Sequence, residues 1–128
     1  MSNELDMTIS PIAHAYTTDE EDVMRVEVLP EYSDALLRIE NLSGLSILFW
    51  MSELDPQQRS TMQVHPMAEM DRPLYGVFAV RNPMRPNPIG VTEVELIRRE
   101  GNSLYVRGLD AFDGSPVIDI KSGHHEHD

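Results

Sequence analysis

The chain has 128 residues, with 22 acidic and 10 basic side chains and a formal net charge of −12. This length suits one domain with a single core, and the hydrophobic share of 41% excludes wholesale disorder. Cysteine is absent, which excludes disulfides, thiolate nucleophiles and cysteine-ligated metal sites. The N-terminus is polar and no apolar run reaches about 18 residues, so we expect a cytoplasmic protein without a membrane span or secretory signal.

The first third of the chain predicts two strands and a helix. Residues 7–15 alternate loosely around Pro11 and predict a first or edge strand. Residues 22–29 alternate more regularly and predict a second strand. Residues 32–42 predict a helix, because their apolar side chains recur at helical spacing and Ser33 is suited to cap the first turn.

The middle of the chain holds its most apolar run and its longest irregular stretch. Residues 45–51 are continuously apolar over the length of a strand, which predicts a central strand of the sheet. Residues 53–74 are polar, rich in Met and interrupted by Pro, so we expect an irregular region there. Within it, residues 61–65 are a candidate strand.

The second half predicts a series of strands that completes a mainly β fold. Four segments have ordinary strand length, at residues 75–81, 91–98, 103–109 and 115–121. Glu100-Gly101-Asn102 predicts a hairpin turn, because Gly and Asn accept a positive φ. About seven or eight strands and one helix predict a single-sheeted closed β-barrel over residues 1–121. Residues 122–128 are a polar, His-rich tail, which we interpret as an incidental terminus and not as a metal site.

A proline-rich segment, Arg81 to Gly90 (RNPMRPNPIG), lies between two of the predicted strands. Its three prolines fix φ and bias the residues before them towards extended backbone. Such a segment has little conformational entropy left to lose when a ligand binds. Arg81 and Arg85 have the forked guanidinium that binds carboxylate or phosphate. Two interpretations stay open, a rigid ligand-binding loop or a stiff turn with outward-facing arginines.

A second segment places three carboxylates, Asp110, Asp113 and Asp119, near strand ends. The sequence Asp113-Gly114-Ser115-Pro116 has turn chemistry, and Asp113 is placed to cap neighbouring amides. Carboxylates also accept hydrogen bonds from ligand hydroxyl or ammonium groups, and a partly buried one can act as a base. Turn formation at Asp113 and solvation at Asp119 are the alternatives to a functional role.

Charge divides unevenly along the chain. Residues 1–71 contain 14 acidic and 3 basic side chains, whereas residues 72–121 contain 6 acidic and 7 basic ones, six of them Arg. Overall acidity argues against strong non-specific binding of nucleic acid, which depends on phosphate neutralisation. The Arg-rich second half leaves open the binding of an anion or a short RNA loop.

Two long motifs resemble those of a known family. They read GVFAVRNPMRPNPIGVTEVEL at residues 76–96 and GNSLYVRGLDAFDGSPVIDIK at residues 101–121. They resemble the TsaA-like (YaeB/TrmO) family, whose patterns are GVFATRSP-RPNPIG and GLDxxDGTPVxDIKPY, and residues 30–50 resemble its middle portion. The resemblance implies a single-sheeted β-barrel that binds S-adenosylmethionine at a homodimer interface. It also implies methylation of N6 of threonylcarbamoyladenosine at position 37 of tRNA.

The resemblance further implies which residues bind the cofactor. Arg81 matches the Arg of the first motif, and Val91 follows the matched RPNPIG. Ser52 and Glu53 stand where the family has a His-Gln pair after the apolar strand. The second motif adds Leu109, Asp110, Asp113, Gly114 and Ser115. Asp113 is the candidate catalytic base, with Asp110 as the other choice, because the acceptor nitrogen carries a proton.

Departures from the family pattern keep three functions open. The family's early Pro-Arg-Gln segment has no counterpart, since residues 17–22 are strongly acidic, and the additional C-terminal domain of some members is not matched. The first function is an S-adenosylmethionine-dependent methyltransferase of tRNA. The second is a methyltransferase of a small molecule with the same cofactor. The third is a non-catalytic S-adenosylmethionine-binding module.

Overall fold

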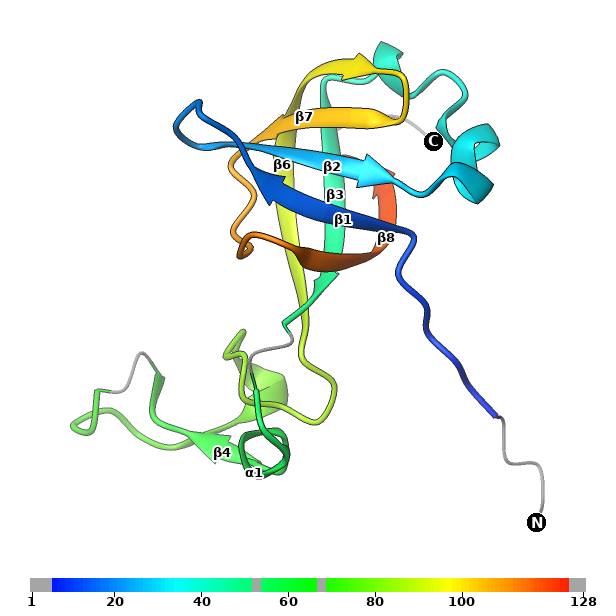
Figure 1. Ribbon diagram of the computed structural model, residues 1–128. Coiled ribbons are helices and arrows are strands. Elements are labelled where there is room, and N and C mark those ends of the chain that lie inside the picture. Colours follow the sequence, from blue (N-terminus) through cyan, green and yellow to red (C-terminus); the bar gives the residue numbers. More distant parts are fainter. Residues whose placement is uncertain (1–5, 52–53, 67–68, 125–128) are drawn as a thin grey trace.

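The computed structural model describes residues 6–51, 54–66 and 69–124, and six of its strands close into an antiparallel barrel (Figure 1). The barrel strands are β1 (Ala13–Thr17), β2 (Val23–Val28), β3 (Gly44–Trp50), β6 (Ile89–Glu100), β7 (Ser103–Arg107) and β8 (Ser115–Ser122). Around the barrel they follow the order β1-β2-β7-β6-β3-β8. The expected closed barrel is therefore confirmed, although six strands form it instead of seven or eight.

The barrel core comes from side chains that alternate along each strand. On β3, Leu45, Ile47 and Phe49 point inward and are buried, while the residues between them are half-buried. This alternation follows from the two-residue period of a strand. β3 pairs with β6 on one side and β8 on the other, which confirms the predicted central strand. The other strands contribute completely buried side chains of their own, including Ala13, Ala15, Val26, Leu104, Val106 and Val117.

The segment expected to form one helix over residues 32–42 forms two short 3-10 helices, so that prediction was wrong. They are η1 (Pro30–Leu36) and η2 (Ile39–Asn41). Ser33 does not cap a helix, because it lies inside η1 and its Oγ donates to the Pro30 carbonyl at 2.8 Å. Leu36 is buried in the core, and Arg38 then takes a left-handed conformation with φ 71°. Burying Leu36 and returning the chain to β3 within a few residues interrupts a regular helix.

Residues 51–88, which we call the arm, leave the barrel after β3 and rejoin it at β6 (Figure 1, green). The arm contains α1 (Pro56–Arg59), β4 (Gln63–Val64), β5 (Tyr75–Gly76) and the 3-10 helix η4 (Val77–Ala79). β4 confirms the candidate strand at residues 61–65. The longer strand predicted at residues 75–81 was wrong beyond Gly76, because β5 pairs only with the two residues of β4 and the chain then turns into η4.

The predicted hairpin turn and the predicted start of the first strand can be compared directly with the structure. The hairpin after β6 is confirmed, since Glu100 pairs with Ser103 and Gly101 has a φ of 63°. The first strand begins at Ala13, later than expected, and the described residues 6–11 make no strand pairing. Pro11 has no N–H to donate to a ladder, which explains the late start.

Among the described residues, no helix has the length and apolar character needed to cross a membrane.

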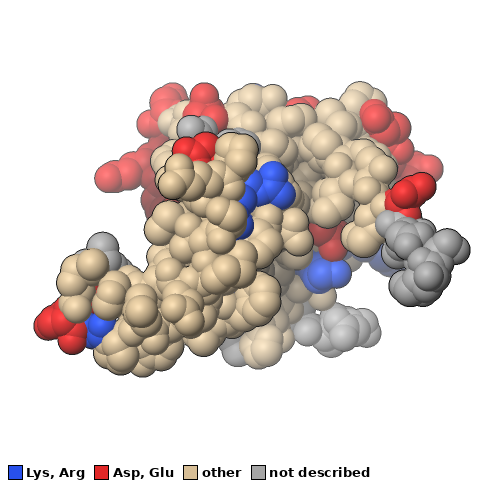
Figure 2. All heavy atoms as spheres, turned by 90° about the horizontal axis from the view of Figure 1, so that it is seen from below, with Lys and Arg blue, Asp and Glu red and all other residues tan. Residues whose placement is uncertain are grey.

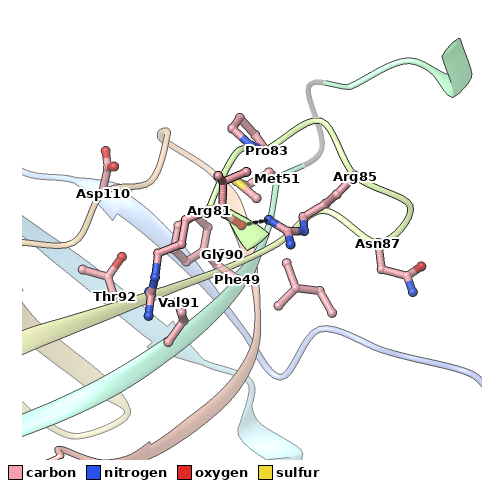
Figure 3. A pocket seen from close by; sticks show the side chains of 12 residues that line it. Phe49, Met51, Arg81, Pro83, Arg85, Asn87, Gly90, Val91, Thr92 and Asp110 are labelled. Carbon is pink, nitrogen blue, oxygen red and sulfur yellow. Dashed lines mark hydrogen bonds between the residues drawn. The ribbon is translucent and has the colours of Figure 1, made fainter. Parts of the chain in front are cut away.

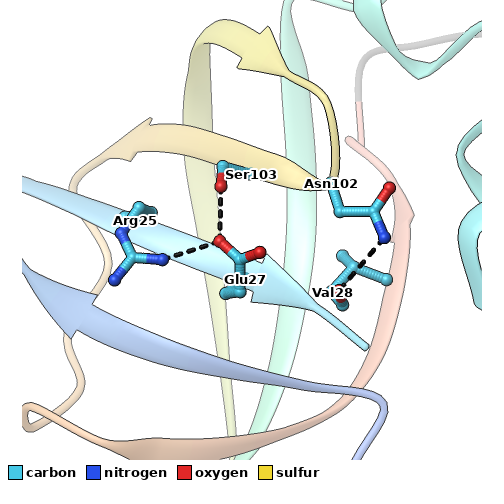
Figure 4. A network of polar contacts seen from close by, with 5 residues as sticks. All are labelled: Arg25, Glu27, Val28, Asn102 and Ser103. Carbon is cyan, nitrogen blue, oxygen red and sulfur yellow. Dashed lines mark hydrogen bonds and ion pairs between the residues drawn. The ribbon is translucent and has the colours of Figure 1, made fainter. Parts of the chain in front are cut away.

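A polar network ties β2 to β7 on the outside of the barrel (Figure 4). Glu27 accepts hydrogen bonds from Arg25, at 2.6 Å, and from the hydroxyl of Ser103. The Asn102 amide donates to the Val28 carbonyl at 3.4 Å, next to the hairpin turn. The outer wall therefore has its own cross-strand contacts, which add to the ladder and help to fix the register.

Candidate functional site

A cavity of about 540 Å³ lies where the arm rejoins the barrel (Figure 3). One wall comes from the barrel, at the end of β3 and the start of β6. The facing wall comes from the proline-rich segment of the arm, and the β7–β8 loop contributes one carboxylate. The lining residues are Phe49, Met51, Val80, Arg81, Pro83, Arg85, Asn87, Ile89, Gly90, Val91, Thr92 and Asp110.

The floor of the cavity depends on a close pairing between an aromatic ring and a glycine. Phe49 on β3 lies directly opposite Gly90 on β6. A Cβ atom at Gly90 would lie 2.6 Å from Cζ of Phe49, which is too close for any side chain. The ring of Phe49 therefore rests over the glycine backbone and forms an apolar surface inside the cavity.

Arg81 and Asp110 supply the cavity with opposite charges. The Arg81 side chain extends along β6 towards Thr92, and Asp110 reaches the cavity from the β7–β8 loop (Figure 3). Both residues are exposed, and within residues 6–51, 54–66 and 69–124 neither side chain forms a hydrogen bond or an ion pair. Their polar groups are therefore available to a ligand that carries an anionic group and a hydroxyl or ammonium group.

Arg85 also lines the cavity, but its donors are committed to the arm itself. Its guanidinium donates to the carbonyls of Val77, Val80 and Asn82, at 2.8, 3.2 and 2.9 Å. The expectation that Arg85 would bind a ligand anion is replaced by a role within the loop. Arg85 thus stiffens the segment, and ligand binding by Arg81 stays a prediction.

The remaining residues predicted from the second motif hold the β7–β8 loop in place and do not line the cavity. The Asp113 carboxylate accepts hydrogen bonds from the backbone N–H and the hydroxyl of Thr17, at 2.9 and 3.2 Å. Gly114 has a φ of 86° and donates its N–H to Ala15. Leu109 belongs to the barrel core and Ser115 is buried at the start of β8. Together these residues fix the loop that carries Asp110.

The structure brings together only part of the predicted set. Arg81, Val91 and Asp110 share the cavity, whereas Ser52 and Glu53 lie outside the described residues. Sequence reasoning missed other lining residues, Phe49, Met51 and Thr92 among them. The opposition of Phe49 and Gly90 could have been found only after β3 and β6 had been aligned in register.

Acidic side chains outnumber basic ones in the chain as a whole, whereas the charged residues that line the cavity are Arg81, Arg85 and Asp110. Figure 2 shows the molecule from below, with acidic side chains gathered at its edges and basic ones standing apart from one another. Most arginines that the structure describes on the strands are neutralised by a nearby Glu, as in the pairs Arg25–Glu27 and Arg107–Glu95. In the same part of the chain, no group of three or more His, Asp or Glu side chains could hold a metal ion. His125 and His127, in the His-rich tail, lie outside the described residues.

These features define a class of protein, a small β-barrel domain with a side cavity that can bind a small zwitterionic or polar molecule. The family model for the tRNA-methyltransferase O N-terminal domain matches residues 10–128. The chain belongs to this family.

Known proteins resemble the chain in sequence and in structure. An S-adenosyl-L-methionine-binding protein of Archaeoglobus fulgidus is 48% identical over 99 residues, which are 77% of this chain and 68% of that protein. A tRNA (adenine(37)-N6)-methyltransferase of Mus musculus is 38% identical over 92 residues, 72% of this chain. The crystal structure of TrmO from Pseudomonas aeruginosa matches 92% of this chain with a TM-score of 0.69 and 27% identity. The chain spans 20% of the mouse enzyme and 56% of the Pseudomonas chain, so it corresponds to one part of each.

Proposed function

We propose that the cavity binds S-adenosylmethionine and that the chain transfers its methyl group to N6 of adenosine 37 of tRNA. The observation that carries this proposal is the pair Arg81 and Asp110, whose charged groups have no other hydrogen bond or ion pair in the described part of the chain and line one cavity. Membership of the family and the names of the relatives support the cofactor and the substrate.

The cavity matches the chemical parts of this cofactor. Arg81 can form a charge-assisted fork with the carboxylate of the methionine portion. Asp110 can accept hydrogen bonds from the ribose hydroxyls or from the ammonium group. Phe49 and Val91 provide apolar surface for the adenine ring, and the volume of about 540 Å³ is ordinary for a small-molecule site.

The chemistry requires alignment more than bond activation. Bound S-adenosylmethionine supplies a methyl group that its sulfonium already activates. The protein must then hold the acceptor nitrogen in line with that methyl and exclude water, and alignment alone can supply about 7–11 kcal/mol in the best intramolecular cases. As the nitrogen gains a methyl group it loses one proton, which a carboxylate or a water molecule must accept.

Two carboxylates are candidates for this base. Asp110 lines the cavity, and the described residues leave its oxygens open to solvent and ligand. Asp113, expected from the motif, accepts two hydrogen bonds from Thr17 instead and stands outside the lining. We therefore assign the base role to Asp110 and propose that Asp113 contributes by fixing the loop that carries it.

We also propose that the chain forms a homodimer and that the arm takes part in its interface. Large apolar side chains on the arm are exposed, and Phe78 is 83% exposed. Exposed apolar surface of this kind is typical of an interface between proteins. Among the arm residues that the structure describes, the other exposed large apolar side chains are those of Met62, Met70, Leu74 and Tyr75. Light scattering coupled to gel filtration should give twice the mass of one chain, and a Phe78→Asp variant should shift it towards the monomer.

Isotopic methyl transfer tests the activity itself. The chain is incubated with labelled S-adenosylmethionine and with tRNA that carries either adenosine or threonylcarbamoyladenosine at position 37. Label in the nucleoside from position 37 supports the proposal, and the difference between the two tRNAs decides whether the threonylcarbamoyl group is required. Arg81→Ala should weaken cofactor binding by about tenfold or more, whereas Asp113→Asn should lower turnover more than affinity. Binding of S-adenosylmethionine with no label in either tRNA contradicts the tRNA substrate.

A second candidate function is methyl transfer to a small molecule. The net charge of −12 and the acidic turn between β1 and β2 favour it, because both oppose the approach of a polyanion. This turn lies beside the β7–β8 loop, since Gly108 donates its N–H to the Asp22 carbonyl at 3.2 Å. If tRNA stays unlabelled, labelled products from a metabolite extract would favour this function. A chain that binds the cofactor and labels neither acceptor would be a binding module.

A further inference from the structure

Arg85 holds together the segment of the arm that carries Arg81. Its Nη1 atom donates to the carbonyls of Val80 and Asn82, and its Nη2 atom donates to the carbonyl of Val77. The three carbonyls belong to residues spread over a six-residue stretch, and the single planar guanidinium of Arg85 donates to all of them. The side chain is half-buried, so these hydrogen bonds compete less with water than they would on an exposed surface.

The position of Arg81 in this arrangement is informative. Arg81 stands between Val80 and Asn82, and the same nitrogen of Arg85 holds both of the flanking carbonyls. The Val80 carbonyl belongs to the peptide that precedes Arg81, and the Asn82 carbonyl belongs to the peptide that follows Asn82. Holding both on one nitrogen limits the combined φ and ψ of Arg81 and Asn82, and therefore the direction in which the Arg81 side chain leaves the backbone. A further hydrogen bond, from the Met84 N–H to Oδ1 of Asn82 at 2.9 Å, closes the turn after it.

We propose that Arg85 is a positioning residue that directs Arg81 into the cavity. This inference rests on the proposed binding of S-adenosylmethionine by Arg81 and adds the device that orients it. A guanidinium has five N–H donors, and Arg85 commits three of them to backbone carbonyls. The end-on fork made by Nη1 and Nη2 is thus engaged within the arm, which separates Arg85 from Arg81 although both residues line the cavity.

The planar fork is necessary for this role. A Lys side chain keeps the positive charge, but its ammonium group is a compact point charge that cannot span three separated carbonyls in one plane. If Arg85 acted only by attracting an anionic ligand, Lys would replace it well. If Arg85 acts by geometry, Arg85→Lys should behave like Arg85→Ala.

Isothermal titration of S-adenosylmethionine into five proteins tests the proposal, namely the unmodified chain, Arg81→Ala, Arg85→Ala, Arg85→Lys and the double variant of Arg81→Ala with Arg85→Ala. We expect Arg81→Ala and Arg85→Ala each to weaken binding by about tenfold or more. The double variant should be no more than about twofold to threefold weaker than Arg81→Ala, because Arg85 acts through Arg81. Arg72→Ala, which removes an exposed arm arginine paired only with Glu69, should bind like the unmodified chain.

Rescue by free guanidinium ion separates positioning from a general loss of structure. At roughly tens of millimolar, far below denaturing concentrations, guanidinium should restore most of the affinity of Arg85→Ala by occupying the three carbonyls. It should not restore that of Arg81→Ala to the same extent. Losses that add in the double variant, affinity of Arg85→Lys close to that of the unmodified chain, or an absence of rescue would each overturn the proposal. Failure of the unmodified chain to bind S-adenosylmethionine would instead overturn the proposed function.

Discussion

The barrel and the arm are held together in different ways. Each of the six barrel strands pairs with two neighbours, and side chains such as Leu45 and Leu104 are completely buried between them. The described residues of the arm form a four-residue helix, two strands of two residues and a 3-10 helix, and Val64 and Val77 are among their few buried side chains. Burial of apolar surface therefore stabilises the barrel, whereas individual polar contacts fix the arm.

This difference explains where the cavity lies. Its barrel wall, with Phe49 and Gly90, is part of a closed sheet and can move little. Its arm wall, with Arg81, is set by hydrogen bonds that can break one at a time without unfolding the protein. Global unfolding should therefore report on the barrel, and ligand affinity should report mainly on the arm.

The largest expected effect comes from the barrel core. Ile47→Ala removes a completely buried side chain from the central strand β3, and we expect a loss of about 2–5 kcal/mol in the free energy of unfolding. Urea denaturation measures this loss. The control Leu37→Ala alters a side chain that is 78% exposed and should change stability by less than about 0.5 kcal/mol. A loss at Ile47 as small as that of the control would contradict the contrast between the two regions.

The next effect lies at the boundary between barrel and arm. Gly90→Ala would place a methyl group 2.6 Å from the ring of Phe49, so the ring must shift into the cavity. We expect a loss of about 1–3 kcal/mol in stability and weaker binding of S-adenosylmethionine by about tenfold. Gly76→Ala is the matched control, because its φ is −63° and no atom lies within 4 Å of the added carbon. Equal behaviour of the two alanine variants would show that Phe49 does not depend on Gly90.

The contrast between the barrel and the arm also determines which elements could be predicted from the sequence. Barrel strands β2, β6, β7 and β8 follow from alternation and from turn residues such as Gly101, because these patterns express the two-residue period of a half-buried strand. Residues 32–42 and 75–81 were predicted wrongly, because their conformation depends on partners distant in the chain. The helical spacing of apolar side chains in residues 32–42 does not show that this segment covers the end of the barrel. In residues 75–81, only two residues form a strand, because β4 offers only two residues for pairing.

In the site as well, features that depend on neighbouring residues could be predicted, whereas features that depend on the folded chain could not. The stiffness of the proline-rich segment and its two candidate anion-binding arginines could be inferred locally, from Pro and Arg in sequence, and the family resemblance singled out Arg81. The division of work between Arg81 and Arg85 could not, because three carbonyls converge on Arg85 only after the chain has folded back on itself. The same holds for Asp113, whose partner Thr17 lies 96 residues earlier.

A smaller effect should be confined to the arm. Arg59 donates to the Pro86 carbonyl at 3.0 Å and lies 5.3 Å from the ring centre of Trp50, so it links α1 to both ends of the arm. Arg59→Ala should cost about 1–2 kcal/mol locally, which speeds hydrogen exchange of nearby arm amides by roughly fivefold to thirtyfold. The N–H of Val77 is a suitable reporter, and that of Leu96 reports on the barrel and should stay unchanged. Faster exchange at both positions would mean that arm and barrel unfold as one unit.

The smallest effect is expected at Arg99 on the barrel, which forms polar contacts similar to those that fix the arm. Apolar burial already stabilises the barrel, so the loss of these contacts should change its free energy of unfolding only slightly. Arg99 joins β6 to the 3-10 helices η1 and η2, because it donates to the Leu36 carbonyl and to the Glu40 carboxylate, at 3.0 and 2.9 Å. A hydrogen bond from its own backbone and then the hydrogen bond from Arg99 lower the pKa of Glu40 below 4.5. Such a carboxylate stabilises the fold above its unfolded pKa and loses this contribution as the pH falls through its folded pKa.

Glu40→Gln should therefore lower the urea midpoint slightly at neutral pH, and the difference from the unmodified chain should shrink towards zero as the pH falls below about 4. Added salt should reduce the difference at neutral pH as well, because this pair is partly exposed. Glu21→Gln, in the exposed turn after β1, controls for the loss of one negative charge. A difference that grows in acid would reverse the sign of the linkage. A loss as large as that of Ile47→Ala would mean that the barrel end depends on this single ion pair in the way that the arm depends on its polar contacts.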